Sequence, residues 1–558
     1  MSVTAGVETF EEWLDAFFAS YYERRPVNAT FVGVHEHDGD LPDLSPEGVE
    51  GAVEEIDRLQ AELGRFPPTE LTERQRLDRK LAAGALDIQR WEYEGEHFHR
   101  SNPCVYTGEA VFGVASLFLT EFAPLSERVD SAVSRMEAIP VFLAQAEETL
   151  GPVPEHWVWR AEDEVTAALA LFGDGLSTLA ESEGIDDPAF DAAAADAYAA
   201  FEAFGEFLDG VETTTDHAAG EGALSLVVER GHFREESLDE IVALGEEQLE
   251  RTNEELRAGL DAFPEDTVVD ALAALADDHP SVEAYYERHT ELWEECREIA
   301  DGRFVDWPDY PLEFVPRPEW VREAAQDLYF LFYRAPAPHD DIEPVEYLLE
   351  PVEPGMDEEE RERRLCRWNT GQIKLNHVAH HGGLGHHVQN HRAYNESDSR
   401  IGEMAAVDTP YRIALCCGGT MAEGWSPYAS ELMRETEFLT DREAYSLHAT
   451  RRRMAARAIV DVKLHRGAFS AEEAMDFYQE NAGMGEGGAR YEVVKNSMFP
   501  GMAVMYLLGL LDVWETRREL EAELGEAFDL QSFHESLLNS GSVPLALKTS
   551  QLREAHVE

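Results

Sequence analysis

The stretch His377-Val378-Ala379-His380-His381-Gly382-Gly383-Leu384-Gly385-His386-His387-Val388-Gln389 holds five of the 20 histidines of this chain. Neutral imidazole is the commonest protein ligand of metal ions, and histidines this dense rarely serve packing alone. The alternative interpretation is a histidine-rich, polar helix end that binds no metal. The residues before the stretch favour an α-helix, because Leu365, Trp368, Ile373 and His380 recur at roughly helical spacing.

The spacing within the stretch predicts which histidines can meet. His377, His380 and His381 are related by i+3 and i+4, so we expect them to share one side of the helix. Six residues of a regular helix span about 600°, which would keep residue 380 away from residue 386. The glycines between 382 and 385 are therefore expected to break the helix and let the pair His386-His387 fold back.

Most of the remaining chain is predicted to be helical. Apolar residues at helical spacing mark a helix over residues 53–63, and an alanine-rich run at 192–203 suits close helix packing. Capping boxes at 237–240 and 470–473 open two further helices. Acidic residues precede basic ones over 357–364, an order that suits the helix dipole. These patterns predict an all-α fold.

One region departs from the helical pattern. Residues 304–355 are rich in proline, so we expect irregular chain and a small β-sheet there. Phe314-Val315 and Leu328–Tyr333 are the candidate strands. The sequence shows no convincing repeat or linker, and 558 residues suffice for one large helical domain. Within residues 1–558, we expect an N-terminal helical half of about 1–230 and a metal-bearing half of about 231–558.

The charge of the chain is strongly acidic. Asp and Glu number 113 against 45 Lys and Arg, a net charge of −68, and the acidic residues are spread along the chain. Such a surface disfavours nucleic acid and anionic membranes as partners. Hydrophobic residues make up 44%, which argues against disorder. We interpret the acidity as adaptation to molar salt in the cytoplasm of a halophile, where the Debye length is about 3 Å.

No segment of the sequence indicates export or membrane insertion. The N-terminus lacks a basic-apolar leader, and no run of about 18 apolar residues occurs, so the protein is predicted to be soluble and cytoplasmic. The five cysteines are odd in number and irregular in spacing, which argues against a disulfide framework. For the adjacent Cys416-Cys417, a soft metal-ligand pair is one alternative, and buried thiols are the one we favour.

Further polar motifs accompany the histidine stretch. In chain order they are Arg25-Pro26-Val27-Asn28-Ala29-Thr30-Phe31-Val32-Gly33-Val34-His35; Glu423-Gly424-Trp425; Arg457, Asp461 and His465; and Glu492-Val493-Val494-Lys495-Asn496, followed by Pro500-Gly501-Met502-Ala503, Tyr506 and Gly509. Together with His380–His387, these motifs resemble the domain-of-unknown-function 885 family, a set of helical proteins similar to zinc metallopeptidases. The resemblance covers nearly the whole chain.

The resemblance implies a set of metal ligands. In zinc peptidases two histidines and a glutamate hold the metal and leave one position open for water. By resemblance, His380, His386 and Glu423 are the expected ligands, with His387 as the alternative to His386. Zinc is the expected ion, although other divalent transition metals accept the same ligands. We expect a deep cleft lined by the segments 380–387 and 495–506 and by residue 423.

The resemblance also implies substrate contacts. Tyr506 and Lys495 are candidate catalytic residues, because a phenol or an ammonium group can stabilise a developing oxyanion. His465, Asn496 and His387 are candidate substrate contacts. Ordinary structural roles remain the alternative for Tyr506 and His465. The implied substrate is a peptide or small amide.

The chain departs from the family motifs at positions expected to carry chemistry. The family glutamate after the first histidine is His381 here, the family proline is Leu384, the Arg-Tyr pair is Lys495-Asn496, and the glutamine after Pro-Gly is Met502. The expected metal ligands are retained, whereas the expected general base is replaced.

Two functions follow from this replacement. His381 can serve as the base, since its ordinary pKa is about 6.5, or it can bind the metal as an extra ligand and close the open position. The first alternative is a divergent zinc-dependent hydrolase of peptides or amides, with His381 as a catalytic residue. The second is a non-catalytic relative with a binding or regulatory role. A carboxylate such as Glu403 or Glu431 beside the metal would favour the first.

Overall fold

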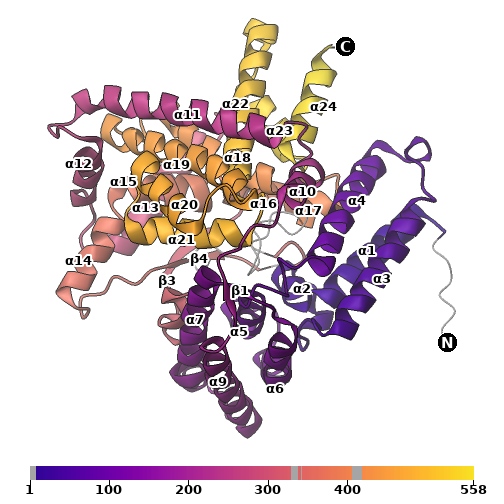
Figure 1. Cartoon of the computed structure of the whole chain (residues 1–558). Helices are drawn as coiled ribbons and strands as arrows, with labels where there is room; N and C mark the ends of the chain where they lie inside the picture. Colours follow the sequence, from indigo (N-terminus) through magenta and orange to yellow (C-terminus); the bar gives the residue numbers. More distant parts are fainter. Residues whose placement is uncertain (1–7, 329–336, 341, 405–417, 558) are drawn as a thin grey trace.

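A computed structural model describes residues 8–328, 337–340, 342–404 and 418–557, and these are mainly helical (Figure 1). The predicted all-α fold is therefore confirmed. Cys416 and Cys417 lie outside the described residues, as do residues 329–333 of the second predicted strand.

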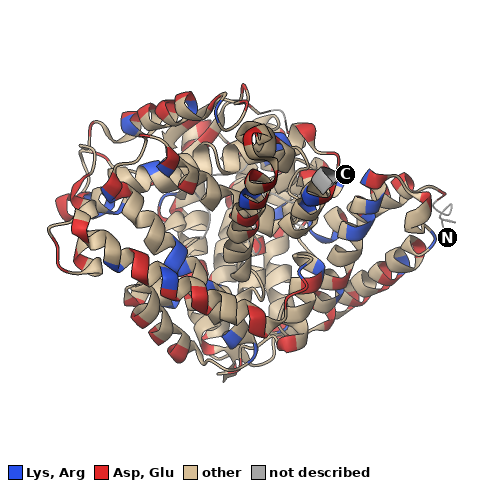
Figure 2. Ribbon diagram, turned by 90° about the horizontal axis from the view of Figure 1, so that it is seen from above, with Lys and Arg blue, Asp and Glu red and all other residues tan. Residues whose placement is uncertain are grey.

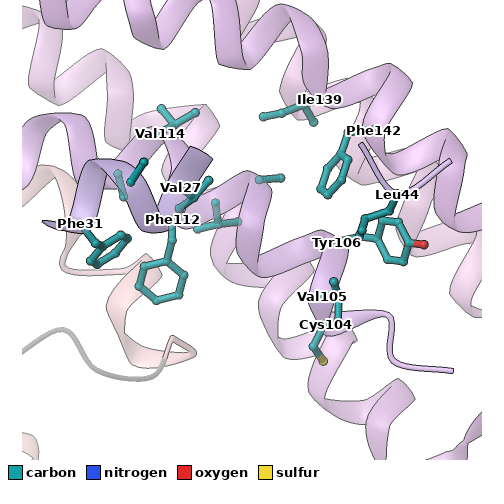
Figure 3. Packing of buried hydrophobic residues seen from close by; sticks show 14 of the residues in the cluster. Val27, Phe31, Leu44, Cys104, Val105, Tyr106, Phe112, Val114, Ile139 and Phe142 are labelled. Atoms are coloured by element: carbon teal, nitrogen blue, oxygen red, sulfur yellow. The ribbon is translucent and has the colours of Figure 1, made fainter. Parts of the chain in front are cut away.

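The N-terminal helices pack around one hydrophobic cluster. Every residue of the helix over 104–119 is buried, as expected for a helix that is apolar on all sides. Figure 3 shows Tyr106, Phe112 and Val114 from this helix packed among Val27 and Ile139 of its neighbours. The helices are α1 (Phe10–Arg24), α2 (Pro26–Val32), α3 (Pro46–Leu63), α4 (Glu73–Glu94), α5 (Cys104–Leu119), α6 (Leu125–Thr149), α7 (Glu155–Ala170), α8 (Leu176–Glu183) and α9 (Pro188–Leu208). The short helix α10 (Glu221–Leu226) follows, and its Leu224 belongs to a second cluster.

The C-terminal helices pack around a second cluster and occupy the opposite side of the molecule (Figure 1). They are α11 (Leu238–Ala258), α12 (Val268–Ala273), α13 (Tyr285–Ala300), α14 (Glu358–Arg367), α15 (Thr370–Gln372), α16 (His386–Glu396), α17 (Arg400–Met404), α18 (Gly419–Leu432), α19 (Asp441–His465), α20 (Ala471–Ala482), α21 (Glu486–Met498), α22 (Val504–Leu524), α23 (Leu530–Leu538) and α24 (Leu545–Val557). Contacts of α4 with α17 and of α7 with α21 join the two groups.

In the described parts of the chain, strands form two small parallel pairs. β1 (Val153–Pro154) pairs with β2 (Thr213–Thr214), and β3 (Leu312–Pro316) pairs with β4 (Val345–Leu349). The second pair lies in the proline-rich region where the sequence predicts a small sheet, and it includes the predicted strand residues Phe314 and Val315.

Local sequence signals decide several helix starts as predicted. Ser237 and Ser470 each form a capping box with the glutamate three residues later, at the starts of α11 and α20. The helix expected to run from Leu365 to His380 is interrupted instead. α14 ends at Arg367, and Asn369 then caps the next segment by accepting a hydrogen bond from the Gln372 backbone.

Acidic residues, red in Figure 2, are spread over the helices in this view, with fewer basic residues among them. Their wide distribution agrees with a net charge of −68. Among the described residues, no helix combines the length and apolar character needed to cross a bilayer.

Candidate functional site

The histidine stretch begins on a π-helical segment, η9 (Ile373–Gly382). The wider i→i+5 turns of a π-helix change which side chains share a face, and such turns are frequent at functional sites. His377 Nδ1 lies 2.7 Å from the hydroxyl of Tyr347, and the two ring centroids are 5.3 Å apart. The grouping of His377 with His380 and His381 on one side of the helix stays a prediction, and the structure gives His377 a hydrogen-bond partner of its own.

The chain then turns back through its glycines, as predicted. A Cβ on Gly385 would lie 1.9 Å from the carbonyl oxygen of His380, so only glycine allows this close approach of the backbone. The Gly385 N–H donates to the carbonyl of Ala379, and α16 begins one residue later at His386. This turn brings His386 back beside His380, with ring centroids 4.9 Å apart.

Three imidazoles and one carboxylate converge at this point. Coordinating atoms of His380, His381 and His386 all lie within 4.8 Å of one another. Glu423 on α18 places Oε2 3.6 Å from His380 Nε2 and Oε1 3.7 Å from His386 Nε2. Ligand atoms of a tetrahedral zinc site with bonds of about 2.0–2.1 Å lie about 3.3 Å apart, which is close to these separations.

The protonation states of the site suit a cation. Burial lowers the pKa of His380 and of His381 to about 3, and it places the pKa of His386 well below its ordinary value. All three rings are therefore neutral at pH 7, the form that binds metals. Glu423 Oε2 is buried, and among the described residues it has no hydrogen-bond partner. A buried carboxylate oxygen without a donor is costly unless a cation compensates it, so the residues fit a divalent metal.

Neighbouring polar groups orient the ligands. His381 Nδ1 donates to the carbonyl of Asn376 at 2.7 Å, which leaves Nε2 as the lone-pair nitrogen. His386 Nδ1 lies 2.9 Å from Ser426 Oγ. The indole of Trp425 donates to the carbonyl of Leu384 at 2.9 Å, so the residue after Glu423-Gly424 holds the histidine turn against α18. Such outer contacts set ring orientation at metal sites.

A close helix crossing positions Glu423. A Cβ on Gly509 of α22 would lie 2.3 Å from the carbonyl oxygen of Thr420 on α18, and one on Gly424 would lie 2.5 Å from the Gly509 carbonyl carbon. The two backbones therefore touch, which only glycine permits. The crossing holds Glu423 on α18 in the same region as Tyr506, one turn before Gly509 on α22.

The site opens into a cavity of about 250 Å³ between α18, α19, α21 and α22. His380, His381, Glu423, Lys495 and Tyr506 are among its lining residues. Lys495 Nζ lies 3.4 Å from the Tyr506 hydroxyl, and the Arg457 guanidinium lies 4.4 Å from the centre of the Tyr506 ring. Both candidate oxyanion contacts thus share one cavity with the histidine–glutamate cluster.

Three other predicted site residues lie elsewhere. His387 is fully buried, its Nε2 donates to the Tyr310 carbonyl at 2.9 Å, and its ring stacks on Tyr310. His465 Nε2 donates to the carbonyl of Asn496 at 2.9 Å, and the Asn496 amide donates to the Tyr478 hydroxyl. None of the three lines the cavity. Of the two alternative metal ligands, His386 places Nε2 3.7 Å from Glu423 Oε1, whereas His387 contacts Tyr310.

The third and fourth sequence motifs bind each other. Arg457 donates to Glu492, with an Nε–Oε2 distance of 2.8 Å. Asp461 accepts backbone N–H groups from Gly501 at 3.1 Å, Ala503 at 2.9 Å and Val504 at 3.1 Å. A carboxylate on these donors stabilises the N-terminus of α22. The motif Arg457-Asp461-His465 therefore anchors the helix that carries Tyr506.

The two carboxylates considered as alternative bases have different positions. Glu431 lines the cavity, but it is paired with Arg451 and accepts the indole N–H of Trp514 at 2.6 Å. Glu403 lies on α17, beside Asp78 and Arg400, and does not line the cavity. Among the described residues, Glu423 and Glu431 are the only acids on the cavity wall.

Sequence reasoning missed several residues of this site. Asn376, Ser426 and Trp425 hold the ligands or the turn between them, and Arg453 lines the cavity. Trp425 follows Glu423 and Gly424 in the Glu-Gly-Trp motif, and this position could have indicated that it lies near the proposed ligand Glu423. Arg453 lies in the run Arg451-Arg452-Arg453, whose members look alike in sequence.

Comparisons with known proteins identify the family and the fold. The model of the family described as "bacterial protein of unknown function (DUF885)" matches residues 26–551. A putative lipoprotein of unknown function from Shewanella oneidensis superposes with a TM-score of 0.77 at 20% identity, covering 98% of this chain and 100% of the other. A putative lipoprotein from Colwellia psychrerythraea gives 0.77 at 17% identity, covering 98% and 99%. At these identities the likeness shows the fold alone. No curated protein matches the chain.

Proposed function

The chain belongs to the DUF885 family of bacterial proteins of unknown function, and from that premise we propose that it is a metal-dependent hydrolase of short peptides or small amides. The observation that carries the proposal is the approach of Glu423 to His380 and His386, at 3.6 and 3.7 Å, on the wall of a cavity. The uncompensated buried oxygen of Glu423 supports these three residues as the ligands. Zinc suits their two imidazoles and one carboxylate.

The proposed chemistry needs an electrophile and an oxyanion contact. A bound zinc ion would polarise the scissile carbonyl and lower the pKa of water toward about 7. Lys495 and Tyr506 share the cavity wall with the ligands and would donate hydrogen bonds to the carbonyl oxygen as negative charge develops. Arg457 packs its guanidinium on the Tyr506 ring and keeps that phenol in place.

His381 occupies the place of the family's general base. A proton acceptor works best when its pKa is near the working pH, and burial lowers the pKa of His381 to about 3. His381 is therefore a weak base, and we propose that the chain hydrolyses its substrates slowly. The ordered tautomer, with Nδ1 donating to Asn376, leaves Nε2 to accept the proton.

The same residue favours a second candidate function, a non-catalytic metal protein with a binding role. The coordinating atom of His381 lies within 4.8 Å of those of His380 and His386. With Glu423, three imidazoles would then complete a tetrahedral set and leave no open position, as in structural zinc sites.

The cellular location also stays a proposal. We propose a cytoplasmic protein adapted to high salt, on the strength of the −68 net charge. The similar structures from Shewanella and Colwellia are named as putative lipoproteins, so an exported protein is the competing alternative. Fractionation of the source cells, with detection of the chain in each fraction, separates the two.

One experiment tests the function and separates its two candidates. The chain is purified in high salt and its zinc content is measured. It is then incubated with a library of short peptides, with and without a chelator. Stoichiometric zinc with slow, chelator-sensitive hydrolysis supports the hydrolase. Stoichiometric zinc without hydrolysis, in both the natural chain and a His381→Glu variant, supports the binding protein. A chain without zinc contradicts both.

A further inference from the structure

Helix α19 brings three arginines to the cavity, and within the described residues only one of them forms no ion pair. Arg451 is paired with Glu431, and Arg457 is paired with Glu492. Arg453 lines the same cavity, and its side chain is exposed. Over the described part of the chain, Arg453 makes no hydrogen bond and no ion pair.

Other described arginines, such as Arg257, also form no ion pair, but Arg453 is set apart by its place in the cavity that His380 and Glu423 line. Guanidinium offers five donors in a planar fork that matches a carboxylate, and it has no acceptor to satisfy itself. Its five donors are left to water or to a ligand in the cavity.

Arg453 lines the same cavity as the proposed metal ligands His380 and Glu423. It lies one helical turn before Arg457, whose guanidinium covers Tyr506. A group bound by Arg453 would therefore lie close to the His380–Glu423 cluster and to the proposed oxyanion contacts.

We infer that Arg453 binds a carboxylate of the substrate, so that the preferred substrates are short peptides or acylated amino acids with a free carboxylate next to the scissile bond. This inference rests on the proposed hydrolase function and names its substrate class. The cavity volume of about 250 Å³ is below the roughly 300–1,000 Å³ of pockets for drug-sized ligands, which suits a ligand about the size of a dipeptide.

The carboxylate has two chemical sources, the C-terminus of a peptide and an acidic side chain. Three probes distinguish them: N-acetyl-alanyl-alanine, its C-terminal amide, and N-acetyl-alanyl-glutamic acid α-amide, whose only free carboxylate is on the side chain. The first and third share the carboxylate, and the second lacks it. Binding of each to the zinc-loaded and the metal-free protein is measured by calorimetry at one fixed potassium chloride concentration, and hydrolysis is measured in parallel.

The variants are Arg453→Gln and Arg453→Lys, with Arg257→Gln as the matched control. Arg257 is also an exposed arginine that makes no hydrogen bond or ion pair within the described residues, but it lies on α11 away from the cavity. Both glutamine variants change the net charge equally. Circular dichroism confirms that each variant is folded, and the lysine variant retains a cation if glutamine disturbs the helix.

We expect the natural chain to bind at least one carboxylate probe about 10–100-fold more tightly than the amide, as for a charge-assisted pair. Arg453→Gln should abolish this preference without weakening amide binding, and Arg257→Gln should retain it. An equal affinity for acids and amide, or a preference that survives Arg453→Gln, overturns the inference. Arg453-dependent binding without any hydrolysis supports the carboxylate site and counts against the hydrolase. Hydrolysis without a preference for the carboxylate probes supports the hydrolase and contradicts the carboxylate site.

Discussion

The close contact between α18 and α22 can be tested by Gly509→Ala, which adds a single methyl group where the two backbones touch. A Cβ at residue 509 would lie 2.3 Å from the Thr420 carbonyl oxygen and 2.7 Å from the Gly424 Cα. The first distance is about 0.7 Å shorter than the 3.0 Å below which real Cβ contacts essentially never fall. Both obstructing atoms are backbone, so no side chain can rotate away. The helices must separate by about 1 Å, and overpacking of this kind costs about 1–3 kcal/mol or more.

Gly509→Ala should therefore lower the free energy of unfolding by about 3 kcal/mol, measured by urea denaturation in high salt. It should also weaken zinc binding, because Glu423 moves with α18. A loss of about 10–100-fold, the range for disturbed outer contacts at metal sites, is expected. Gly487→Ala on α21 is the matched control, because a Cβ there meets nothing within 4 Å. That change should stabilise the chain by about 0.5–1 kcal/mol. Equal unfolding free energies for the two variants would refute the close-contact argument.

Three further predictions concern salt, pH and the general base. The Debye length shrinks from about 10 Å at 0.1 M salt to about 3 Å at 1 M, which screens the repulsion within a chain of net charge −68. The melting temperature should therefore rise with the potassium chloride concentration. Equal melting temperatures at low and high salt would show that the acidic surface needs no screening. Burial lowers the pKa of His156 and of His465 to about 3, so these histidines bind protons at higher pH in the unfolded chain than in the folded one. The free energy of unfolding should therefore be unaffected above about pH 6.5 and should fall as the pH drops from there toward 3. The expected loss is up to about 1.4 kcal/mol per histidine and pH unit. A denaturation series whose pH slope is unchanged in His156→Gln would contradict this. His381→Glu should raise peptidase activity, since a well-placed general base contributes about 10²–10⁴-fold; strong natural activity that survives His381→Ala would assign the base role to another residue.

The sequence was sufficient where one local signal decides one local structure. Serine and glutamate at the capping positions predicted the starts of α11 and α20, because each cap is completed within four residues. The approach of residue 386 to residue 380 followed from the glycines between them, since only a broken helix allows it. Glu423, by contrast, was joined to the histidines through the family resemblance, because no local rule relates α18 to η9.

Other features depend on contacts between distant segments. The direction of His377 depends on whether residues 373–382 form an α-helix or a π-helix. They form a π-helix, and the His377 ring lies against Tyr347. The helical spacing of Asp461 and His465 showed a polar face, but it could not show that this face binds the 496–504 segment and not a substrate. Arg451 and Arg453 both line the cavity, and Arg451 is paired there with Glu431, a difference that exists only after folding.

The central claim is that Glu423 is a metal ligand, and the most direct measurement is the zinc content of Glu423→Gln after dialysis, compared with Glu403→Gln. Glu403 is a partly buried carboxylate away from the cavity, so its substitution removes the same charge without touching the histidines. Glutamine keeps the shape of residue 423 and removes the charge that would compensate the cation. The account predicts about one zinc per chain in the natural protein and in Glu403→Gln, and almost none in Glu423→Gln. Stoichiometric zinc in Glu423→Gln would contradict it.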